Sequence, residues 1–461
     1  MRYISTRGQT PSVTFEEALL GGLAPDGGLY VPQNYPQFSA NDIIKMRTLP
    51  YADIAKKIMS PFVGNALETE TFERIVEDCY QDFNHSAVAP IRQLDHHLWF
   101  YELFHGPTLA FKDYALQLVG RLFDAVLQKN GQRLTIVGAT SGDTGSAAIA
   151  ACAGAKNIDI FILHPKGRVS PVQERQMTSV LAPNVHNIAL EGSFDDCQDQ
   201  VKALFADKVF REEVCLGAVN SINWGRIMGQ VAYYAVACAR LARADTPLDI
   251  SVPSGNFGNI FAAYVAKRMG FPIGQLGVSS NKNDILARFL TQNDMSIKAV
   301  EPSHAPSMDI QISSNFERYL FELMERDGAS LARKIQDFRK TGKMQFSTEL
   351  WACAQQDFIS FRLDDAGIEA EIKRWYKKTG LLLCPHSVIA VAHAAQDGRF
   401  KNPVLCIGTA HPAKFPDVVQ RTTGIYPQLP DNMKDLMERK TRCINMANDT
   451  ETLKAFVRER Q

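Results

Sequence analysis

The spacing of hydrophobic positions along the chain changes near residue 95, and this change predicts two kinds of structure. Before it, apolar residues in 43–64 recur at helical spacing, and Gly and Pro residues in 16–38 mark turns. From about residue 97, short apolar runs alternate with longer segments of helical periodicity. Such alternation predicts an α/β fold with mostly parallel sheets flanked by helices.

Seven apolar runs are expected as strands, and five of the segments between them as helices. The expected strands are 97–103, 133–139, 157–163, 184–190, 247–254, 274–280 and 403–410. The expected helices are 112–129, 144–154, 170–181, 193–207 and 258–270. Pro171 near the start of one helix and Ser193 before early acidic residues in another are typical of helix N-termini.

The same patterns predict three parts. Residues 1–95 form a mainly helical N-terminal domain, and 96–430 form an α/β region of two subdomains. Within that region, about 295–400 reads as a mainly helical insertion. The charged segment 431–461 is expected to be a helical tail.

Charge and composition narrow the class of partner. The chain of 461 residues carries 50 Lys plus Arg and 50 Asp plus Glu, so its net charge is zero. This balance removes the main reason to expect nucleic acid or an anionic membrane as partner. The N-terminus lacks the apolar core of a signal peptide, and no run reaches the ~18 apolar residues of a membrane span. We therefore expect a cytoplasmic protein. We also expect a small-molecule substrate and a monomer or a weak homo-oligomer.

The cysteines favour a reducing compartment and no metal site. The nine cysteines are scattered, odd in number, and form no C-x-x-C pair. There is no H-E-x-x-H motif, and the doublet His96-His97 opens an expected strand, where neighbours point to opposite faces. Free buried thiols fit this pattern better than disulfides or zinc.

Three polar loops follow expected strands and carry the candidate chemistry. They are "GATSGDTG" (138–145), "PSGNFGN" (253–259) and "GTAHPAKF" (408–415). Ligands of open α/β sheets bind beyond the carboxyl ends of the strands, so we expect these loops to open at the same edge.

The loop 253–259 is a candidate anion site. Gly255 and Gly258 allow close approach of the backbone to a ligand, and the helix that follows offers free N–H groups and a positive dipole end. The loop matches neither the Walker A pattern nor G-x-G-x-x-G. A plain turn in which asparagine adopts a left-handed conformation remains open.

Lys112 is the candidate nucleophilic amine. It begins an expected helix after Ala110-Phe111, and an apolar flank can lower the pKa of a lysine. A solvated surface lysine is the ordinary alternative. A reactive lysine together with a glycine-rich anion loop is what a pyridoxal phosphate enzyme needs, for the Schiff base and for the phosphate.

Together, "HGPTLAFKD", "TSGDTG", "SVPSGNFGN" and "GTAHPAKF" resemble the threonine synthase family of the longer bacterial and fungal type. "GLAPDGGLYVP", "GRVSPVQERQM" and "NSINWGRI" fit the same family, so the resemblance covers nearly the whole chain. It implies a tryptophan-synthase-β-like fold, the type II fold of pyridoxal phosphate enzymes. It also implies conversion of O-phospho-L-homoserine and water to L-threonine and phosphate, by γ-elimination and β-addition of water.

The resemblance carries roles to individual positions. It makes Lys112 the Schiff-base lysine and later the base, and Thr409 the hydroxyl facing the pyridine nitrogen. It puts Asp143 near the cofactor 3-hydroxyl. The loop residues implied to hold the cofactor phosphate are Gly255, Asn256, Phe257, Gly258 and Asn259. The residues implied to grip the substrate carboxylate, through hydroxyl and backbone N–H donors, are Ser141, Gly142, Thr144 and Gly145.

The substrate phosphate needs further cations or amides, and two segments could supply them. The first set is Asn220, Ser221, Asn223 and Arg226, and the second is Lys166, Arg168 and Ser170. Ordinary helix capping and surface charge remain alternatives for both. Thr409 could likewise be a plain cap before Pro412, and His105 could position Lys112 or be a satisfied loop histidine.

One departure from the family pattern is visible: Asn259 stands where aspartate is often found, which leaves the backbone N–H in place. Other functions also remain open. A related pyridoxal phosphate lyase would eliminate phosphate without controlled addition of water. A cofactor-free homologue would need neither Lys112 nor both glycine loops. A nucleotide-binding protein ranks lower, because neither common nucleotide loop is present.

Overall fold

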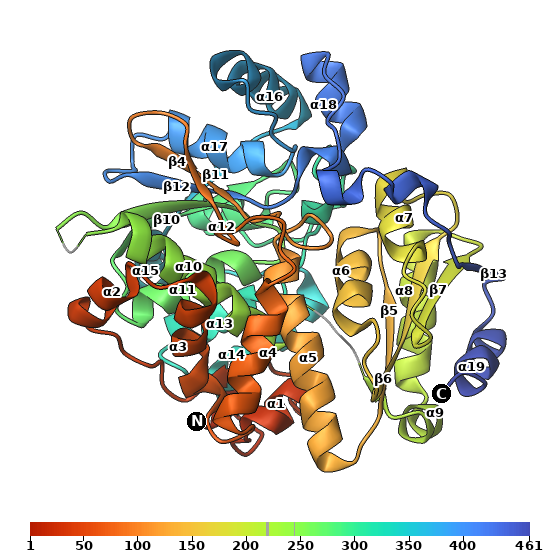
Figure 1. Cartoon of the computed structure of the whole chain (residues 1–461). Helices are drawn as coiled ribbons and strands as arrows, with labels where there is room; N and C mark the ends of the chain where they lie inside the picture. Colours follow the sequence, from red (N-terminus) through yellow and green to blue (C-terminus); the bar gives the residue numbers. More distant parts are fainter. Residues whose placement is uncertain (218–220, 244) are drawn as a thin grey trace.

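The computed structural model describes residues 1–217, 221–243 and 245–461. Two open sheets form its frame, and Figure 1 shows them in separate halves of the molecule, with α5 and α6 between the halves. The strands of the first sheet, in spatial order, are β11 (Phe358–Arg362), β10 (Ile273–Ser280), β9 (Leu248–Pro253), β12 (Val404–Gly408), β4 (Leu98–Glu102) and β3 (Ile91–Gln93). Those of the second are β13 (Ile444–Met446), β7 (Val185–Leu190), β6 (Ile158–Pro165), β5 (Leu134–Ala139) and β8 (Leu216–Gly217).

Both sheets are dominated by parallel pairs, which confirms the predicted fold class. Every pair in the second sheet is parallel. Among the described residues of the first sheet, only the β3–β4 pair is antiparallel. Strand β6 is buried along its whole length, as expected for a parallel strand with helices on both faces.

The N-terminal region is mainly helical, as expected, with one small antiparallel pair of β1 (Tyr3–Ser5) and β2 (Tyr30–Pro32). Its helices are α1 (Phe15–Gly21), α2 (Ala40–Met46), α3 (Tyr51–Val63) and α4 (Thr69–Tyr80). Thr14 and Glu17 form a capping box that starts α1, and Ser39 and Asp42 form one that starts α2.

The helices around the sheets follow the polar and apolar pattern of the chain. They are α5 (Lys112–Asn130), α6 (Asp143–Cys152), α7 (Pro171–Thr178), α8 (Phe194–Ala206), α9 (Lys208–Glu213), α10 (Trp224–Leu241), α11 (Gly258–Arg268) and α12 (Ile285–Gln292). Ser193 and Asp196 cap α8, and Ser170 caps α7 with Pro171 at its first position. These caps explain why both helices begin where the sequence predicts.

The later part of the chain contributes helices and two short strands that the sequence pattern does not reveal. The elements are η1 (Pro306–Met308), α13 (Phe316–Leu323), α14 (Gly328–Thr341), α15 (Thr348–Asp357), α16 (Asp365–Thr379), α17 (Ser387–Gln396), η2 (Pro412–Lys414), α18 (Pro416–Thr423), η3 (Asp431–Met433), η4 (Leu436–Glu438) and α19 (Thr450–Arg458). Strand β11 lies inside the expected helical insertion. Strand β13 lies inside the expected helical tail and extends the second sheet beside β7. Each has few residues, too few for a period-2 pattern to stand out.

The expectation that all three polar loops open from one sheet edge is wrong. The loop 138–145 leaves β5 in the second sheet, whereas 253–259 and 408–415 leave β9 and β12 in the first. The alternation of strands and helices predicts parallel pairing but does not say which strands share a sheet. Within the described residues, no helix is long and apolar enough to cross a membrane.

Candidate active site

Lys112 is the first residue of α5, and the segment before it is fixed to the end of β12. Ala110 bridges to Ala410, and the N–H of Phe111 donates to the carbonyl of Thr409 at 2.9 Å. These contacts join the lysine motif directly to the loop 408–415. They place these two motifs side by side, although about 300 residues separate them in the sequence.

The turn before Lys112 is closed by a buried carboxylate. Thr108 donates its N–H and its hydroxyl to Asp113 at 2.8 and 2.6 Å. Burial raises the pKa of Asp113 to about 6. A Cβ at Gly106 would meet the Asp113 side chain at 2.5 Å, so only glycine fits there.

The side chain of Lys112 is largely buried and ends on Asp143. Its Nζ lies 3.1 Å from Asp143 Oδ2, and only 11% of the side chain is exposed. Burial lowers the pKa of Lys112, and the charges of Lys414 and Arg226 lower it further, against the attraction of Asp143. This environment differs from that of a solvated lysine, which removes the ordinary alternative for Lys112.

Asp143, at the start of α6, is the centre of the site. Its Oδ2 also accepts from Ser307 Oγ at 3.0 Å. Its Oδ1 accepts from Gln173 Nε2 at 2.7 Å and from Lys414 Nζ at 2.8 Å. Burial would raise the pKa of this carboxyl, but Lys112 and Lys414 outweigh burial and hold it well below its usual range.

The loop 138–145 surrounds Asp143, and its two glycines are used for packing. The N–H groups of Gly142 and Gly145 donate to Thr140 Oγ1 at 3.0 and 2.8 Å. A Cβ at Gly142 would meet Gln173, and one at Gly145 would meet Thr140. The expectation that these two glycines supply free N–H donors therefore needs correction, because a ligand would first have to displace Thr140. Ser141 is exposed and Thr144 half-buried, so their hydroxyls remain accessible.

The loop 253–259 has the features of an anion site. Phe257 adopts a left-handed conformation (φ 62°) and turns the chain into α11. No described residue accepts a hydrogen bond from the N–H groups of Gly255, Asn256 or Phe257. Three such groups at a helix N-terminus form a cradle for an anion.

This loop is held from outside by residues that are distant in sequence. The N–H of Ser314 donates to Asn256 Oδ1 at 2.7 Å, and the hydroxyl of Ser313 donates to the carbonyl of Gly255 at 2.8 Å. Asn256 also donates to the hydroxyl of Ser221. Ser221, which was predicted to bind the substrate, thus supports the loop through this hydrogen bond.

Asn259 faces the protein interior. Its Oδ1 accepts from the hydroxyls of Tyr233 and Tyr234 at 2.8 and 2.5 Å. The side chain therefore anchors the loop to α10. An aspartate at this position could accept the same two bonds.

Thr409 lies at the end of β12 with a nearly free hydroxyl. Its N–H donates to Ser387 Oγ at 2.9 Å, while its Oγ1 lies 3.5 Å from that oxygen. The following 3-10 turn is capped by His411 instead, whose Nδ1 accepts from the N–H of Ala413. The alternative that Thr409 is only a helix cap is therefore wrong.

Of the residues predicted for the substrate phosphate, Arg226 is the one with free charge. It is 4% exposed, and its Nε and Nη1 have no partner among the described residues. Burial lowers its pKa to about 10, so it remains a cation at neutral pH. Asn223 caps α10 through a bond from the N–H of Gly225 and donates to the carbonyl of Leu19. Asn220 lies outside the described residues.

The second predicted set lies at the surface. Ser170 caps α7, Lys166 pairs with Glu191 at 3.6 Å, and Arg168 is exposed. This arrangement supports capping and surface charge as their roles. His105 is also satisfied, because its Nε2 lies 3.0 Å from Glu102.

Sequence reasoning missed four residues around Asp143. Gln173 and Lys414 stand inside motifs that the resemblance uses, but nothing in their spacing reveals that they meet. Ser307 and His386 come from segments without periodicity or a motif. His386 is neutral, because burial lowers its pKa to about 4, and its Nε2 accepts from the N–H of Ser307 at 3.2 Å. Its Nδ1 then carries the proton and has no described partner.

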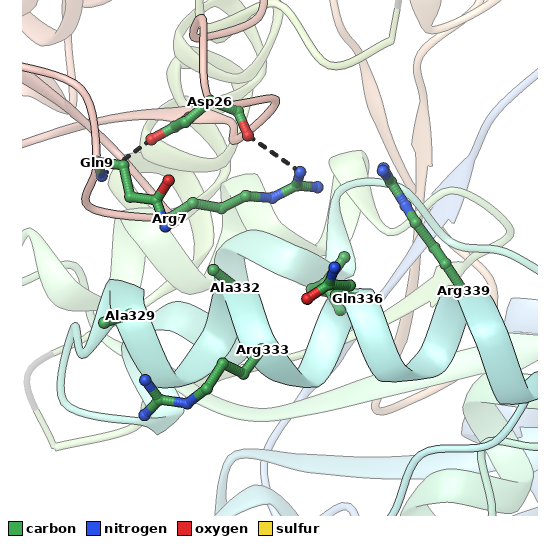
Figure 2. A pocket seen from close by; sticks show the side chains of 9 residues that line it. Arg7, Gln9, Asp26, Ala329, Ala332, Arg333, Gln336 and Arg339 are labelled. Atoms are coloured by element: carbon green, nitrogen blue, oxygen red, sulfur yellow. Dashed lines mark hydrogen bonds between the residues drawn. The ribbon is translucent and has the colours of Figure 1, made fainter.

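A cavity of about 420 Å³ lies elsewhere, between the N-terminal segment and α14 (Figure 2). Figure 2 shows the guanidinium of Arg7 turned toward Asp26, whose carbonyl it bonds at 3.3 Å. Arg7 also pairs with Glu317 at 3.1 Å. None of the residues that line this cavity belongs to the group around Lys112.

Comparison with known proteins shows which enzyme family this site belongs to. Residues 2–80 match the family "Threonine synthase N terminus", 85–337 match "Pyridoxal-phosphate dependent enzyme", and 387–457 match "Threonine synthase, C-terminal". The chain belongs to the threonine synthase family. Threonine synthase of Pseudomonas aeruginosa is 50% identical over 459 residues, covering 99% of this chain and 98% of that protein.

Solved structures of the family agree with this assignment. The pyridoxal-phosphate-bound threonine synthase of Brucella melitensis is 48% identical, covers 100% of this chain and 99% of its own, and superposes with a TM-score of 0.98. Yeast threonine synthase is 36% identical and superposes with a TM-score of 0.94, covering 100% and 98%. A human relative that carries the name "Threonine synthase-like 2" is 37% identical over 456 residues, covering 97% of this chain and 94% of that protein.

Proposed function

We propose that the chain converts O-phospho-L-homoserine and water to L-threonine and phosphate, with Lys112 as the lysine that links the cofactor. Its family makes it a pyridoxal-phosphate-dependent lyase of threonine biosynthesis. The assignment of Lys112 rests on the position of its Nζ, which is largely buried and lies 3.1 Å from Asp143 Oδ2. An amine in this position is both reactive and oriented.

The residues present fit pyridoxal phosphate. The free N–H groups of Gly255, Asn256 and Phe257 suit its phosphate, and Gly258 and Asn259 continue that helix N-terminus. The hydroxyl of Thr409 suits the pyridine nitrogen, and Asp143 suits the edge of the ring near Lys112. Because Thr409 is neutral, it does not hold a proton on that nitrogen as a carboxylate would.

Lys112 is proposed to move the protons of the reaction. Bound pyridoxal phosphate supplies an electron sink for negative charge beside the substrate nitrogen. Lys112 Nζ would take the Cα proton and give it up to the conjugated system of the bound cofactor, which frees the amine to take a Cβ proton. The same amine would then return this proton at Cγ after phosphate has left. Asp143 keeps the amine oriented throughout these steps.

The excess of positive charge supports a phosphorylated substrate. Lys112 and Lys414 pair with Asp143, and the charge of Arg226 is close enough to Lys112 to lower its pKa. We propose that Arg226 binds the substrate phosphate, since it is a buried cation whose Nε and Nη1 have no described partner. Asn220, Ser221 and Asn223 would shape that subsite, while the accessible hydroxyls of Ser141 and Thr144 would meet the substrate carboxylate.

The products of O-phospho-L-homoserine test this function. We expect equal amounts of L-threonine and phosphate from the purified holoenzyme. Phosphate together with a 2-oxo acid and no threonine would favour the lyase alternative. The differently named human relative makes this distinction necessary. We also propose a monomer or a weak homo-oligomer. A cytoplasmic location stays a prediction.

Replacing Gly255 with alanine is expected to weaken cofactor binding about 10-fold or more. The new Cβ would meet the Cα of Met308 at 2.9 Å, a backbone atom that cannot move alone. Such overpacking costs about 1–3 kcal/mol, and here it displaces the anion cradle. Fluorescence titration of the full-length chain with pyridoxal phosphate measures the change.

Gly398→Ala is the matched control, because no atom lies within 4 Å of the added Cβ. It should bind the cofactor as the wild type does. Equal affinities of Gly255→Ala and wild type would show that this loop does not hold the phosphate.

A further inference from the structure

Lys414 is a second buried lysine on the carboxylate of Asp143. It ends η2, its side chain has no exposure, and its Nζ lies 2.8 Å from Asp143 Oδ1. Its other bond, at 2.7 Å, goes to the carbonyl of Thr108. Gln176 shares that carbonyl at 3.2 Å. The roles described above use Lys112 and Asp143 but leave Lys414 without one.

Packing alone does not explain a charge in this position. Moving an ammonium group out of water costs several kcal/mol, and apolar residues of similar size often serve a core equally well. The carbonyl of Thr108 could be satisfied by Gln176 without Lys414. The feature that needs a cation here is Asp143.

Each carboxylate oxygen of Asp143 is bonded by one lysine, and the side chains of the two lysines differ in their exposure to solvent. Lys112 lies at Oδ2 on the side of the site, with 11% of its side chain exposed. Lys414 lies at Oδ1 with none exposed. Lys112 must lose and regain a proton during the reaction. Without Lys414, each loss would leave buried Asp143 with only the neutral donors Ser307 and Gln173.

We propose that Lys414 is a positioning residue that keeps Asp143 ionised whatever the state of Lys112 and that favours the unprotonated amine of Lys112. When the proton leaves Lys112 Nζ, Lys414 remains as the counter-charge, so Asp143 does not take that proton. No bond of Lys414 is made or broken. The inference rests on the proposed role of Lys112 as the reacting amine.

The direction of the effect follows from the charges around Lys112. Asp143 favours its charged form, whereas Lys414 and Arg226 disfavour it. His386 is neutral, and Asp113 is hydrogen-bonded by Thr108, with Lys414 also lowering the pKa of Asp113. Removing the positive charge of Lys414 therefore raises the pKa of Lys112, and the amine becomes reactive only at higher pH.

Lys414→Gln tests the inference, because glutamine keeps a donor for the carbonyl of Thr108 but carries no charge. Trace labelling with acetic anhydride across a pH series, read by mass spectrometry of the Lys112 peptide, gives the pH at which that amine is half-deprotonated. The full-length chain freed of cofactor is used. We expect this midpoint to rise by about one unit. Lys414→Met should also raise this midpoint. In the holoenzyme of both variants, the pH dependence of kcat should shift to higher pH as well.

Gln176→Met is the matched control, because it removes the uncharged donor from the same carbonyl. Its labelling midpoint should stay at the wild-type value. An unchanged midpoint in Lys414→Gln or Lys414→Met, with or without a lower Tm, would mean that Lys414 only supports the fold and would overturn the inference. The labelling needs no turnover. If Lys112→Ala still formed threonine, the proposed function of Lys112 would fail whatever the labelling showed.

Discussion

Replacing Lys112 with alanine is expected to lower kcat by at least about 10³-fold, because one side chain serves as both the cofactor link and the proton carrier. Its Nζ lies 3.1 Å from Asp143 Oδ2. The pyridoxal phosphate absorbance band should also be lost or displaced, while the Tm of the chain changes little. Steady-state assays of phosphate and threonine together with the visible spectrum measure both effects.

Lys129→Ala is the control for this substitution. Lys129 lies in the last turn of the same helix and pairs with Glu16 near the surface. It should leave both kcat and the spectrum unchanged. Threonine formation at a near-wild-type rate by Lys112→Ala would contradict the assignment.

Replacing Arg226 with methionine is expected to lower kcat/KM by roughly 30-fold or more, mainly through KM. Truncating one partner of a buried charge pair costs about 2–5 kcal/mol, and the pair here would be Arg226 with the substrate phosphate. Without substrate, its Nε and Nη1 have no described partner. The substitution should therefore leave the Tm unchanged or raise it, because it removes an uncompensated buried charge.

Arg318→Met is the control for Arg226→Met, and we expect it to affect the Tm rather than KM. Arg318 is equally buried but donates to Tyr30, Ile222 and Asn315, so its loss should lower the Tm. Kinetics and thermal unfolding of both variants separate a binding role from a structural one. A lower Tm with unchanged KM in Arg226→Met would contradict the proposed phosphate subsite.

The parts of the site that lie in strand-to-helix loops could be predicted from the sequence. Lys112, Asp143 and Thr409 each stand at such a junction, where polar residues interrupt a clear apolar pattern. Helix starts such as Ser170 and Ser193 were visible for the same reason, because caps act through neighbouring residues.

Contacts between distant segments could not be predicted. Ser307, His386 and Lys414 reach Asp143 only after the sheets pack together, and no local pattern marks that meeting. The division of the strands between two sheets was missed for the same reason. Gly142 and Gly145 show a subtler limit. Glycine suggested open backbone for a ligand, whereas Thr140 already binds their N–H groups.

The position of the cofactor link tests the central claim most directly, because two buried lysines meet the same carboxylate. Reducing the holoenzyme with borohydride fixes the pyridoxyl group, and mass spectrometry of its peptides identifies the modified lysine. The account predicts a single pyridoxyl group on Lys112, whose amine is the accessible one. A pyridoxyl group on Lys414, or on any lysine away from Asp143, would contradict it.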